Sequence, residues 1–393
     1  MALPIAVLVG GPLAVLASPS AVHANPPYAP VDLTAVTGAP AASGAPMGDF
    51  VCTVAPCGSR VVYETGARHV EMIAYNLDST HYKKYDLTAL SGAPLAACPT
   101  CTPEGRPWFD GVLDEVVYVT GSGHVEDLSM SGSAWKAKDL SALTGAPKAA
   151  SIPMGYFSDV AGAGEDRVVY STATGHVEEL SRPAASTVWA AKDLSALTGA
   201  PPASSPPFGF STGNPSALAQ VVYETASGAV EQLALPHAGT WHAHNLTSLA
   251  GAPAAAAGTE PVGYVAAAMR VVYESASGSV MALSSSNETT WTSSNLSTIT
   301  GAPLAVKGPR GYDTGENGGA TDVVVYETAS GAIEEIYGQI GVGLTPVNVS
   351  MSAGAPKAKT FPQGYDNNNL GSPETDGVVY ETTSSHIELL YNL

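Results

Sequence analysis

The chain is poor in charge, and most of the charge it carries is negative. Only 13% of its 393 residues are Asp, Glu, Lys or Arg, and 16 basic residues stand against 35 acidic ones, for a formal net charge of -19. A nucleic-acid-binding surface neutralises phosphates with Lys and Arg, and anionic membranes attract clusters of the same residues. The composition therefore argues against nucleic acid and anionic membranes as partners.

Long hydrophobic stretches are absent after the first residues of the chain. Residues 2–17 are almost wholly apolar and small residues follow up to Ala24, as in a secretory signal cleaved after Ala24, although no basic residue precedes the apolar run. A buried N-terminal strand is the alternative. No later stretch approaches the roughly 18 apolar residues of a membrane span. We therefore expect a signal peptide at residues 1–24, a secreted protein and no membrane span.

Cysteine is scarce, with 4 residues in the spacings C-x4-C and C-x2-C. An even number of cysteines after a signal peptide favours disulfides, whose pairing is either local or between neighbouring repeats. Four thiolates also match the ligands of a structural zinc site, which is the alternative. We expect disulfides and no metal at Cys52, Cys57, Cys98 and Cys101.

The most prominent feature of the sequence is an internal repeat. Three motifs recur in the same order at equivalent places of seven repeats: Asp/Asn-Leu/Val-Thr/Ser, Gly-Ala-Pro and Val-Val-Tyr. Successive Val-Val-Tyr tyrosines lie 50 to 55 residues apart. Self-similarity at such a period indicates a solenoid, a propeller or an array. The tyrosines are Tyr63, Tyr118, Tyr170, Tyr223, Tyr273, Tyr326 and Tyr380.

Each repeat is predicted to form four short strands. They are rich in Val, Tyr and Trp and are bounded by Gly, Pro and Ser, and no part of the repeat has helical periodicity. In the third repeat, strand one opens at Pro153–Tyr156, and the others are Arg167–Thr172, Gly175–Leu180 and Trp189–Ser195. Four strands per repeat of this length make a propeller blade. We therefore predict an all-β, seven-bladed β-propeller with antiparallel blades, forming one domain over residues 25–393.

The two ends of the chain predict how the ring closes. Residues 28–35 repeat the fourth strand without the three that precede it, and residues 386–391 repeat the third strand with no fourth after it. The N-terminal strand is therefore expected to complete blade seven beside the C-terminal strand. Such pairing hides strand edges that would otherwise invite aggregation.

We expect up to seven shallow ligand sites, at one face of the ring or between blades. In antiparallel order, the turn between strands two and three lies at the same end as the Gly-Ala-Pro connection to the next blade, and binding residues usually lie on loops that a rigid scaffold holds. Three residue types recur in the repeats: Glu after Val-Val-Tyr, His before strand three and Trp at strand four. They are Glu64, Glu224, Glu274, Glu327 and Glu381; His69, His124, His176 and His386; and Trp135, Trp189, Trp241 and Trp291.

Each of these types also has a purely structural interpretation. The Glu is a candidate acceptor for backbone N–H groups in the turn, the His is a candidate cap, and the Trp is a candidate for packing between blades. The functional interpretation groups them, because a flat ring beside a carboxylate and an imidazole suits a sugar, whose hydroxyls pair with the polar groups. Repetition then predicts several weak, equivalent sites that act together.

The third repeat resembles the PLL-type seven-bladed bacterial propeller lectins, which bind fucose and related sugars, and the resemblance extends over all seven repeats from about Tyr28 to Leu393. Strand three of that family often reads Gly-His-Ile-His-Glu-Leu, and Glu178 stands here at the second His. The matching segments are Gly145–Pro147, Pro153–Tyr156, Val168–Tyr170, Gly175–Leu180 and Trp189–Ser195. The resemblance implies a lectin whose partners are glycans or glycoconjugates.

Signatures of catalysis are missing. The chain has no G-x-S-x-G, H-E-x-x-H or P-loop motif. Glycoside hydrolysis needs two carboxylates at a defined separation, whereas here carboxylates recur from blade to blade and no unique pair stands out. We therefore predict a secreted, multivalent carbohydrate-binding protein without catalysis or cofactor. A protein-interaction scaffold and a polysaccharide lyase or glycoside hydrolase are the alternatives.

Overall fold

The structure is a computed structural model that describes residues 28–51, 58–76, 81–97, 108–109, 115–131, 134–160, 163–212, 217–236, 239–314, 321–367 and 375–392. The predicted signal peptide and all four cysteines, with their predicted disulfides, lie outside these residues. Among the described residues, no helix is long and apolar enough to cross a membrane.

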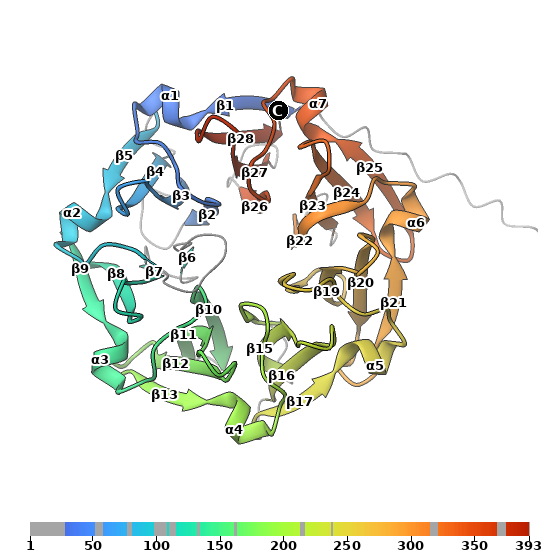
Figure 1. Ribbon diagram of the computed structural model, residues 1–393, viewed down its shortest axis with the longest axis horizontal. Coiled ribbons are helices and arrows are strands. Elements are labelled where there is room, and N and C mark those ends of the chain that lie inside the picture. Colours follow the sequence, from blue (N-terminus) through green and yellow to red (C-terminus); the bar gives the residue numbers. More distant parts are fainter. Residues whose placement is uncertain are drawn as a thin grey trace, which may run out of the picture.

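Seven four-stranded antiparallel sheets stand around a central axis, which confirms the predicted propeller (Figure 1). From the axis outward, blades 1 to 3 are β2 (Met47–Val51), β3 (Gly58–Glu64), β4 (Val70–Asn76), β5 (Lys83–Asp86); β6 (Trp108–Phe109), β7 (Glu115–Val119), β8 (Val125–Ser131), β9 (Ala134–Asp139); and β10 (Met154–Val160), β11 (Ala163–Ser171), β12 (Val177–Pro183), β13 (Ala190–Asp193).

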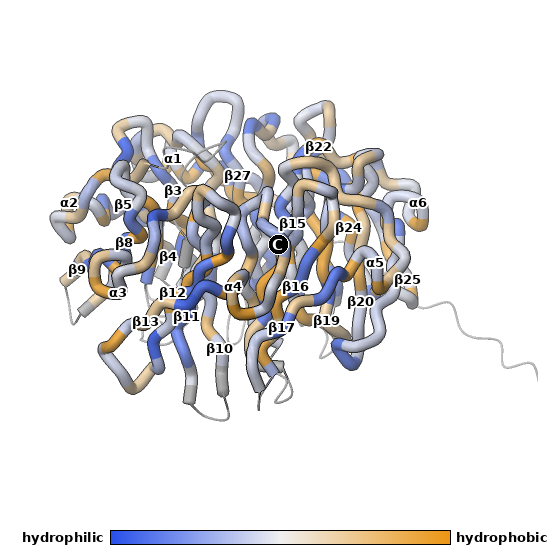
Figure 2. The backbone as a smooth tube through the Cα atoms, turned by 60° about the horizontal axis from the view of Figure 1, so that its bottom comes forward, coloured by the Kyte–Doolittle hydropathy of each residue, from blue (hydrophilic) through white to orange (hydrophobic). Residues whose placement is uncertain are grey.

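The remaining blades follow the same order. Blades 4 to 6 are β14 (Phe208–Phe210), β15 (Ala217–Glu224), β16 (Val230–Pro236), β17 (His242–Asn245); β18 (Val262–Val265), β19 (Met269–Glu274), β20 (Val280–Ser285), β21 (Thr292–Asn295); and β22 (Ala305–Asp313), β23 (Asp322–Thr328), β24 (Ile333–Gln339), β25 (Gly343–Asn348). Blade 7 is β26 (Gln363–Asn367), β27 (Thr375–Glu381), β28 (Ile387–Asn392) and β1 (Tyr28–Asp32). Figure 2 shows the strands running between the two faces of the ring.

The N-terminal strand closes the ring, as predicted. Strand β1 pairs antiparallel with β28, with Val31 opposite Leu389 and Asp32 opposite Glu388. The hydroxyl of Tyr28 also donates to Glu335 of blade 6 at 2.5 Å. Blade 7 is therefore held by hydrogen bonds between the two ends of the chain.

A one-turn helix follows the fourth strand of every blade, which the sequence interpretation missed. The Asp or Asn before each helix accepts the N–H three residues on, and a Gly with φ between 60° and 72° ends it, so both caps are those that helices prefer. The expected fourth strand Trp189–Ser195 was too long, since β13 ends at Asp193 and Leu194 begins a helix. The helices are α1 (Leu33–Thr37), α2 (Leu87–Ser91), α3 (Leu140–Thr144), α4 (Leu194–Thr198), α5 (Leu246–Ala250), α6 (Leu296–Thr300) and α7 (Val349–Ala353).

Two repeated contacts join neighbouring blades. Each Val-Val-Tyr tyrosine is buried and donates its hydroxyl to the Pro carbonyl of the Gly-Ala-Pro loop that leads into its blade, at 2.7–3.0 Å. Nearer the axis, the strand-one aromatic of one blade lies on the strand-one glycine of the next. A Cβ built on Gly209 would overlap the ring of Tyr156, and one on Gly263 would overlap Phe210. These motif residues are therefore explained by packing between blades.

Candidate functional site

The four candidate histidines share one contact. Each lies just before strand three, and its Nδ1 atom lies 2.6–2.7 Å from the Oδ2 atom of the Asp at the end of strand four. The side chains remain half-exposed, at 34–45% for the His and 33–36% for the Asp. Within the described chain, no hydrogen bond reaches the other ring nitrogen, Nε2. The pairs are His69–Asp86, His124–Asp139, His176–Asp193 and His386–Asp32.

The local fold fixes the position of this pair. The other carboxylate oxygen of Asp193, Oδ1, accepts the backbone N–H of Ala196 at 2.7 Å and so caps α4. Because one oxygen holds the helix and the other meets His176, the carboxylate has a defined orientation. When the His is neutral and donates through Nδ1, its Nε2 atom is an acceptor that faces solvent.

A third titratable side chain lies beside each pair. Glu178 is opposite Asp193 in the register of β12 and β13, and it is buried. Burial, and then the negative charge of Asp193, raise the pKa of Glu178 to about 7. Burial and the neighbouring Asp raise the pKa of Glu126 and Glu388 to about 7 in the same way. The pKa of Glu71 is raised for the same reasons, burial first.

The other three blades are built differently at this place. Their helix cap is Asn245, Asn295 or Asn348, and Ala229, Ser279 or Ala332 stands where the His would be. The amide of Asn348 donates to Glu334 at 3.1 Å. We call blades 7, 1, 2 and 3 the His sector and blades 4, 5 and 6 the Asn sector. The co-occurrence of His with Asp is visible in the sequence, and the sequence interpretation overlooked it.

A ring of exposed apolar side chains accompanies these caps and was also missed. The fourth residue of α1 to α6 and the third residue of α7 are aliphatic or Met, and these side chains are 50–76% exposed. This residue comes four positions after the capping Asp or Asn in six blades and three positions after Asn348 in blade 6, and residues at either spacing are neighbours on one helix face. The residues are Val36, Leu90, Leu143, Leu197, Leu249, Ile299 and Met351.

The glutamates after Val-Val-Tyr do not join the histidines of their own blades. Successive side chains of a strand point to opposite faces, so Glu224 points away from the face of Tyr223. The carboxylate of Glu224 accepts the N–H of Gly258, in the loop that enters blade 5. Glu64, Glu224, Glu327 and Glu381 are buried, and Glu274 is half-buried.

The strand-four tryptophans lie at the far end of the blade. Trp135, Trp189, Trp241 and Trp291 are only 4–8% exposed. The guanidinium of Arg182 lies 5.0 Å from the centre of the Trp189 ring. Arg182 is six residues from His176 along one strand, which is a separation of roughly 20 Å. The structure therefore does not bring His, Glu and Trp together in one pocket, as the sequence interpretation grouped them.

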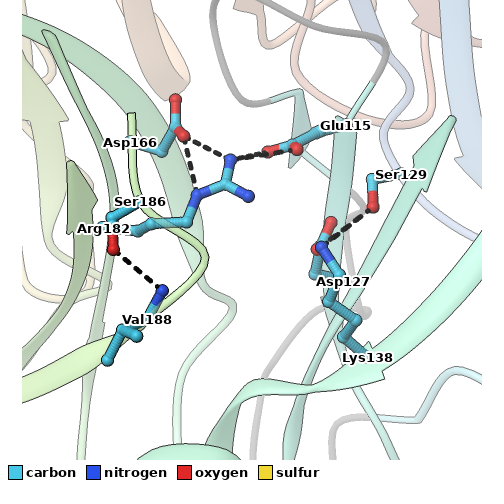
Figure 3. A network of polar contacts seen from close by, with 8 residues as sticks. All are labelled: Glu115, Asp127, Ser129, Lys138, Asp166, Arg182, Ser186 and Val188. Carbon is cyan, nitrogen blue, oxygen red and sulfur yellow. Dashed lines mark hydrogen bonds and ion pairs between the residues drawn. The ribbon is translucent and has the colours of Figure 1, made fainter. Parts of the chain in front are cut away.

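Arg182 belongs to a buried polar network between blades 2 and 3 (Figure 3). It binds both Asp166 of its own blade and Glu115 of the neighbouring one. Nearby, Lys138 lies 3.5 Å from Asp127. Burial, and then the charge of Glu115, raise the pKa of Asp127 to about 7. Since Arg182 pairs with carboxylates of both blades, we assign the network to the blade interface.

A separate cavity of about 680 Å³ opens among the loops that enter blades 3 to 7. Its lining includes Glu260, Glu274, Lys307, Arg310 and Phe361. The guanidinium of Arg310 pairs with Glu260 and lies 4.5 Å from the centre of the Phe361 ring. No His–Asp pair lines this cavity. In the described part of the chain, no cluster of three or more His, Cys, Asp and Glu side chains is arranged to hold a metal ion.

No protein-family model matches the chain, and no curated protein matches it. Solved structures are similar to it in their β-propeller architecture. The BP39L lectin from Burkholderia pseudomallei is similar with a TM-score of 0.68 and 13% identity over 89% of this chain and 96% of that one. AofleA from Arthrobotrys oligospora has a TM-score of 0.51 and 12% identity, with 84% and 92% covered. For the fucose-specific lectin from Aleuria aurantia these values are 0.50 and 12%, with 78% and 96% covered. At these identities the similarity concerns the propeller fold.

Proposed function

We propose that this protein is a secreted, multivalent carbohydrate-binding protein without catalysis, and that its sugar sites lie at the His–Asp pairs of the His sector. The observation that carries the proposal is a half-exposed imidazole and carboxylate, held in a fixed orientation and repeated in four neighbouring blades. An exposed aliphatic side chain follows four residues after each Asp. A few oriented polar groups beside an apolar surface are typical of small-ligand sites.

The chemistry of this arrangement suits a sugar. The Nε2 atom of His176 accepts a hydrogen bond from one sugar hydroxyl, and the Oδ2 atom of Asp193 accepts one from a second hydroxyl. Leu197 packs against the C–H face of the sugar ring. We propose the same roles for the His, the Asp and the aliphatic residue at the other three pairs, which contain His69, His124 and His386. The buried tryptophans and the glutamates after Val-Val-Tyr are assigned to the scaffold, because neither group lies beside these pairs.

The solved structures support fucose or a related sugar as the ligand class. The Aleuria aurantia protein is described as fucose-specific, and a mutant of it was solved in complex with α-methyl-L-fucoside. A methyl group such as that of fucose matches the exposed aliphatic side chains. Each site is shallow, so single sites are expected to be weak, and simultaneous binding on a glycan-covered surface raises avidity by roughly 10² to 10⁴.

A glycan array tests the proposal, followed by calorimetry with the best monosaccharide. We expect four sites per chain. The variant Ala229→His/Asn245→Asp installs the His–Asp pair in blade 4 and should raise the number to five. The matched control is Ala229→Ser, which introduces the residue that blade 5 has at this position, and it should leave the number of sites at four. Failure of the array to show any bound glycan, or a stoichiometry that ignores the installed pair, would contradict the proposal.

A further inference from the structure

The glutamate after Val-Val-Tyr is neutralised by a lysine in two blades. The carboxylate of Glu327 lies 2.9 Å from the ammonium group of Lys307, and that of Glu381 lies 2.7 Å from that of Lys359. Lys307 lies in β22, at the fourth residue after Gly-Ala-Pro, and Lys359 lies in the loop that enters blade 7, at the third residue after Gly-Ala-Pro. This carboxylate position therefore accommodates a primary ammonium group.

Blade 5 has the glutamate without the lysine. The third and fourth residues after its Gly-Ala-Pro are Ala256 and Ala257. Both alanines and Glu274 line the 680 Å³ cavity, so open space lies where the other two blades place a lysine side chain. Among the described residues, no side chain or backbone N–H donates to the carboxylate of Glu274. Glu224 differs, because the N–H of Gly258 donates to it.

The other charges in the cavity wall are compensated. Lys307 pairs with Glu327, and Arg310 pairs with Glu260. The charge of Glu274 is the one left without a counter-charge in the described lining. Burial alone raises the pKa of this carboxyl, to about 6, and no cation acts to lower it. At neutral pH the cavity therefore presents a mostly ionised carboxylate next to small, uncharged residues.

We propose that this cavity binds a small amino sugar through its free, protonated amine, which takes beside Glu274 the place that the Lys307 ammonium has beside Glu327. The remaining lining offers hydroxyls and backbone groups, with Ser204 and Thr259 among them, that suit the hydroxyls of the same sugar. This site goes beyond the function proposed above, since it is a single site on the loops and uses none of the four His–Asp pairs.

Calorimetry at neutral pH with two probes tests the site: the trisaccharide of glucosamine, which has free amines, and its fully N-acetylated form. We expect one bound glucosamine trisaccharide per chain, with at least about tenfold preference over the acetylated form. Glu274→Gln should remove that preference. Glu224→Gln, at the equivalent position of blade 4, should change it less than about twofold, which separates the site from general attraction to an acidic protein.

A second variant acts without touching the carboxylate. Ala257→Lys places a lysine at the position that Lys307 has in blade 6, and it should fill the space and abolish binding of the glucosamine trisaccharide while the thermal midpoint is kept. Absence of binding, equal binding of the two probes, or an unchanged preference in Glu274→Gln would overturn the proposal. Fucosides probe the His sector. If the protein binds fucosides but not the glucosamine trisaccharide, the proposal for the Glu274 cavity is wrong and the proposed function is unaffected.

Discussion

The His sector and the Asn sector share one scaffold and differ at one place. Asp and Asn cap the same one-turn helix equally well, with the side-chain oxygen accepting the N–H three residues on in all seven blades. The difference lies in the other polar atom of the capping side chain, which is an oxygen in Asp and a nitrogen in Asn. The second oxygen of Asp193 meets the imidazole of His176, whereas the nitrogen of Asn348 itself donates to Glu334. Comparing the sectors therefore separates the helix cap, which the fold requires in every blade, from the exposed His–Asp pair, which only the His sector has.

The largest expected effect concerns the part that both sectors share. Gly48→Ala in the His sector and Gly263→Ala in the Asn sector each push a methyl group into the aromatic ring of the preceding blade. Overpacking of this kind should lower the free energy of unfolding by about 3 kcal/mol in either sector. Chemical denaturation measures the loss. Gly66→Ala is the control, since nothing lies within 4 Å of its added Cβ. A loss confined to one sector would break the idea of a common scaffold.

The next effect should separate the sectors. Replacing His69, His124, His176 and His386 together by Ala removes every proposed imidazole acceptor, and it should reduce avidity for a fucosylated surface by roughly 10². Surface plasmon resonance reports this loss. Replacing Asn245, Asn295 and Asn348 by Ser, which keeps a helix cap, is the control in the Asn sector and should leave avidity unchanged. Equal losses in both sets would contradict the assignment of sites to the His sector.

A smaller effect concerns pH. The pKa values of Glu126, Glu178 and Glu388 are about 7 in the folded chain, above their ordinary value of 4.5. Between these values the folded chain binds more protons than the unfolded chain, so their contribution to stability falls as the pH rises from about 4.5 to about 7 and is constant above. The thermal midpoint should therefore decrease over this range.

Replacing these three residues by Gln should flatten the profile. The control is Glu231→Gln/Glu334→Gln in the Asn sector. Hydrogen bonds from Asn245 and Asn348 oppose the rise in pKa that burial causes at Glu231 and Glu334. This control should therefore flatten the profile less. A steeper profile in the triple Gln variant would show that other groups set the pH dependence.

The smallest effect concerns the turn between strands two and three. Five blades place a Gly there with φ between 77° and 81°, but blades 1 and 7 of the His sector use Arg68 at 64° and Ser385 at 63°. A left-handed conformation is costly for residues other than Gly. Arg68→Gly and Ser385→Gly should each raise the free energy of unfolding by about 0.5–1 kcal/mol. The reverse change, Gly228→Ser in the Asn sector, should lower it, and denaturant titration distinguishes these signs.

Most of the fold was readable from the sequence because each motif marks a place that recurs in every blade. Val-Val-Tyr marks strand two, and the incomplete repeats at the two ends predicted that the N-terminal strand lies beside the C-terminal strand, as β1 and β28 do. The one-turn helices were missed because five residues are too few to show helical periodicity. Their caps were nevertheless visible, as an Asp or Asn six residues before a Gly.

The site was harder to predict because it depends on contacts between strands. The histidines were identified, but their Asp partners lie 15 to 17 residues away, or 354 in blade 7, and only the register brings them together. The burial of Trp189 and of the glutamates after Val-Val-Tyr depends on tertiary packing, which the sequence of a single repeat does not reveal. The cavity beside Glu274 depends on two alanines that look unremarkable in isolation.

The pair in blade 7 has a consequence for biosynthesis. Asp32 leaves the ribosome 354 residues before His386, so a nascent chain can assemble the other three pairs well before this one. An antibody or sugar probe specific for blade 7 would therefore recognise only molecules in which β1 has paired with β28. Trimming the amino terminus past Asp32 would erase that signal while leaving the pairs of blades 1 to 3 in place.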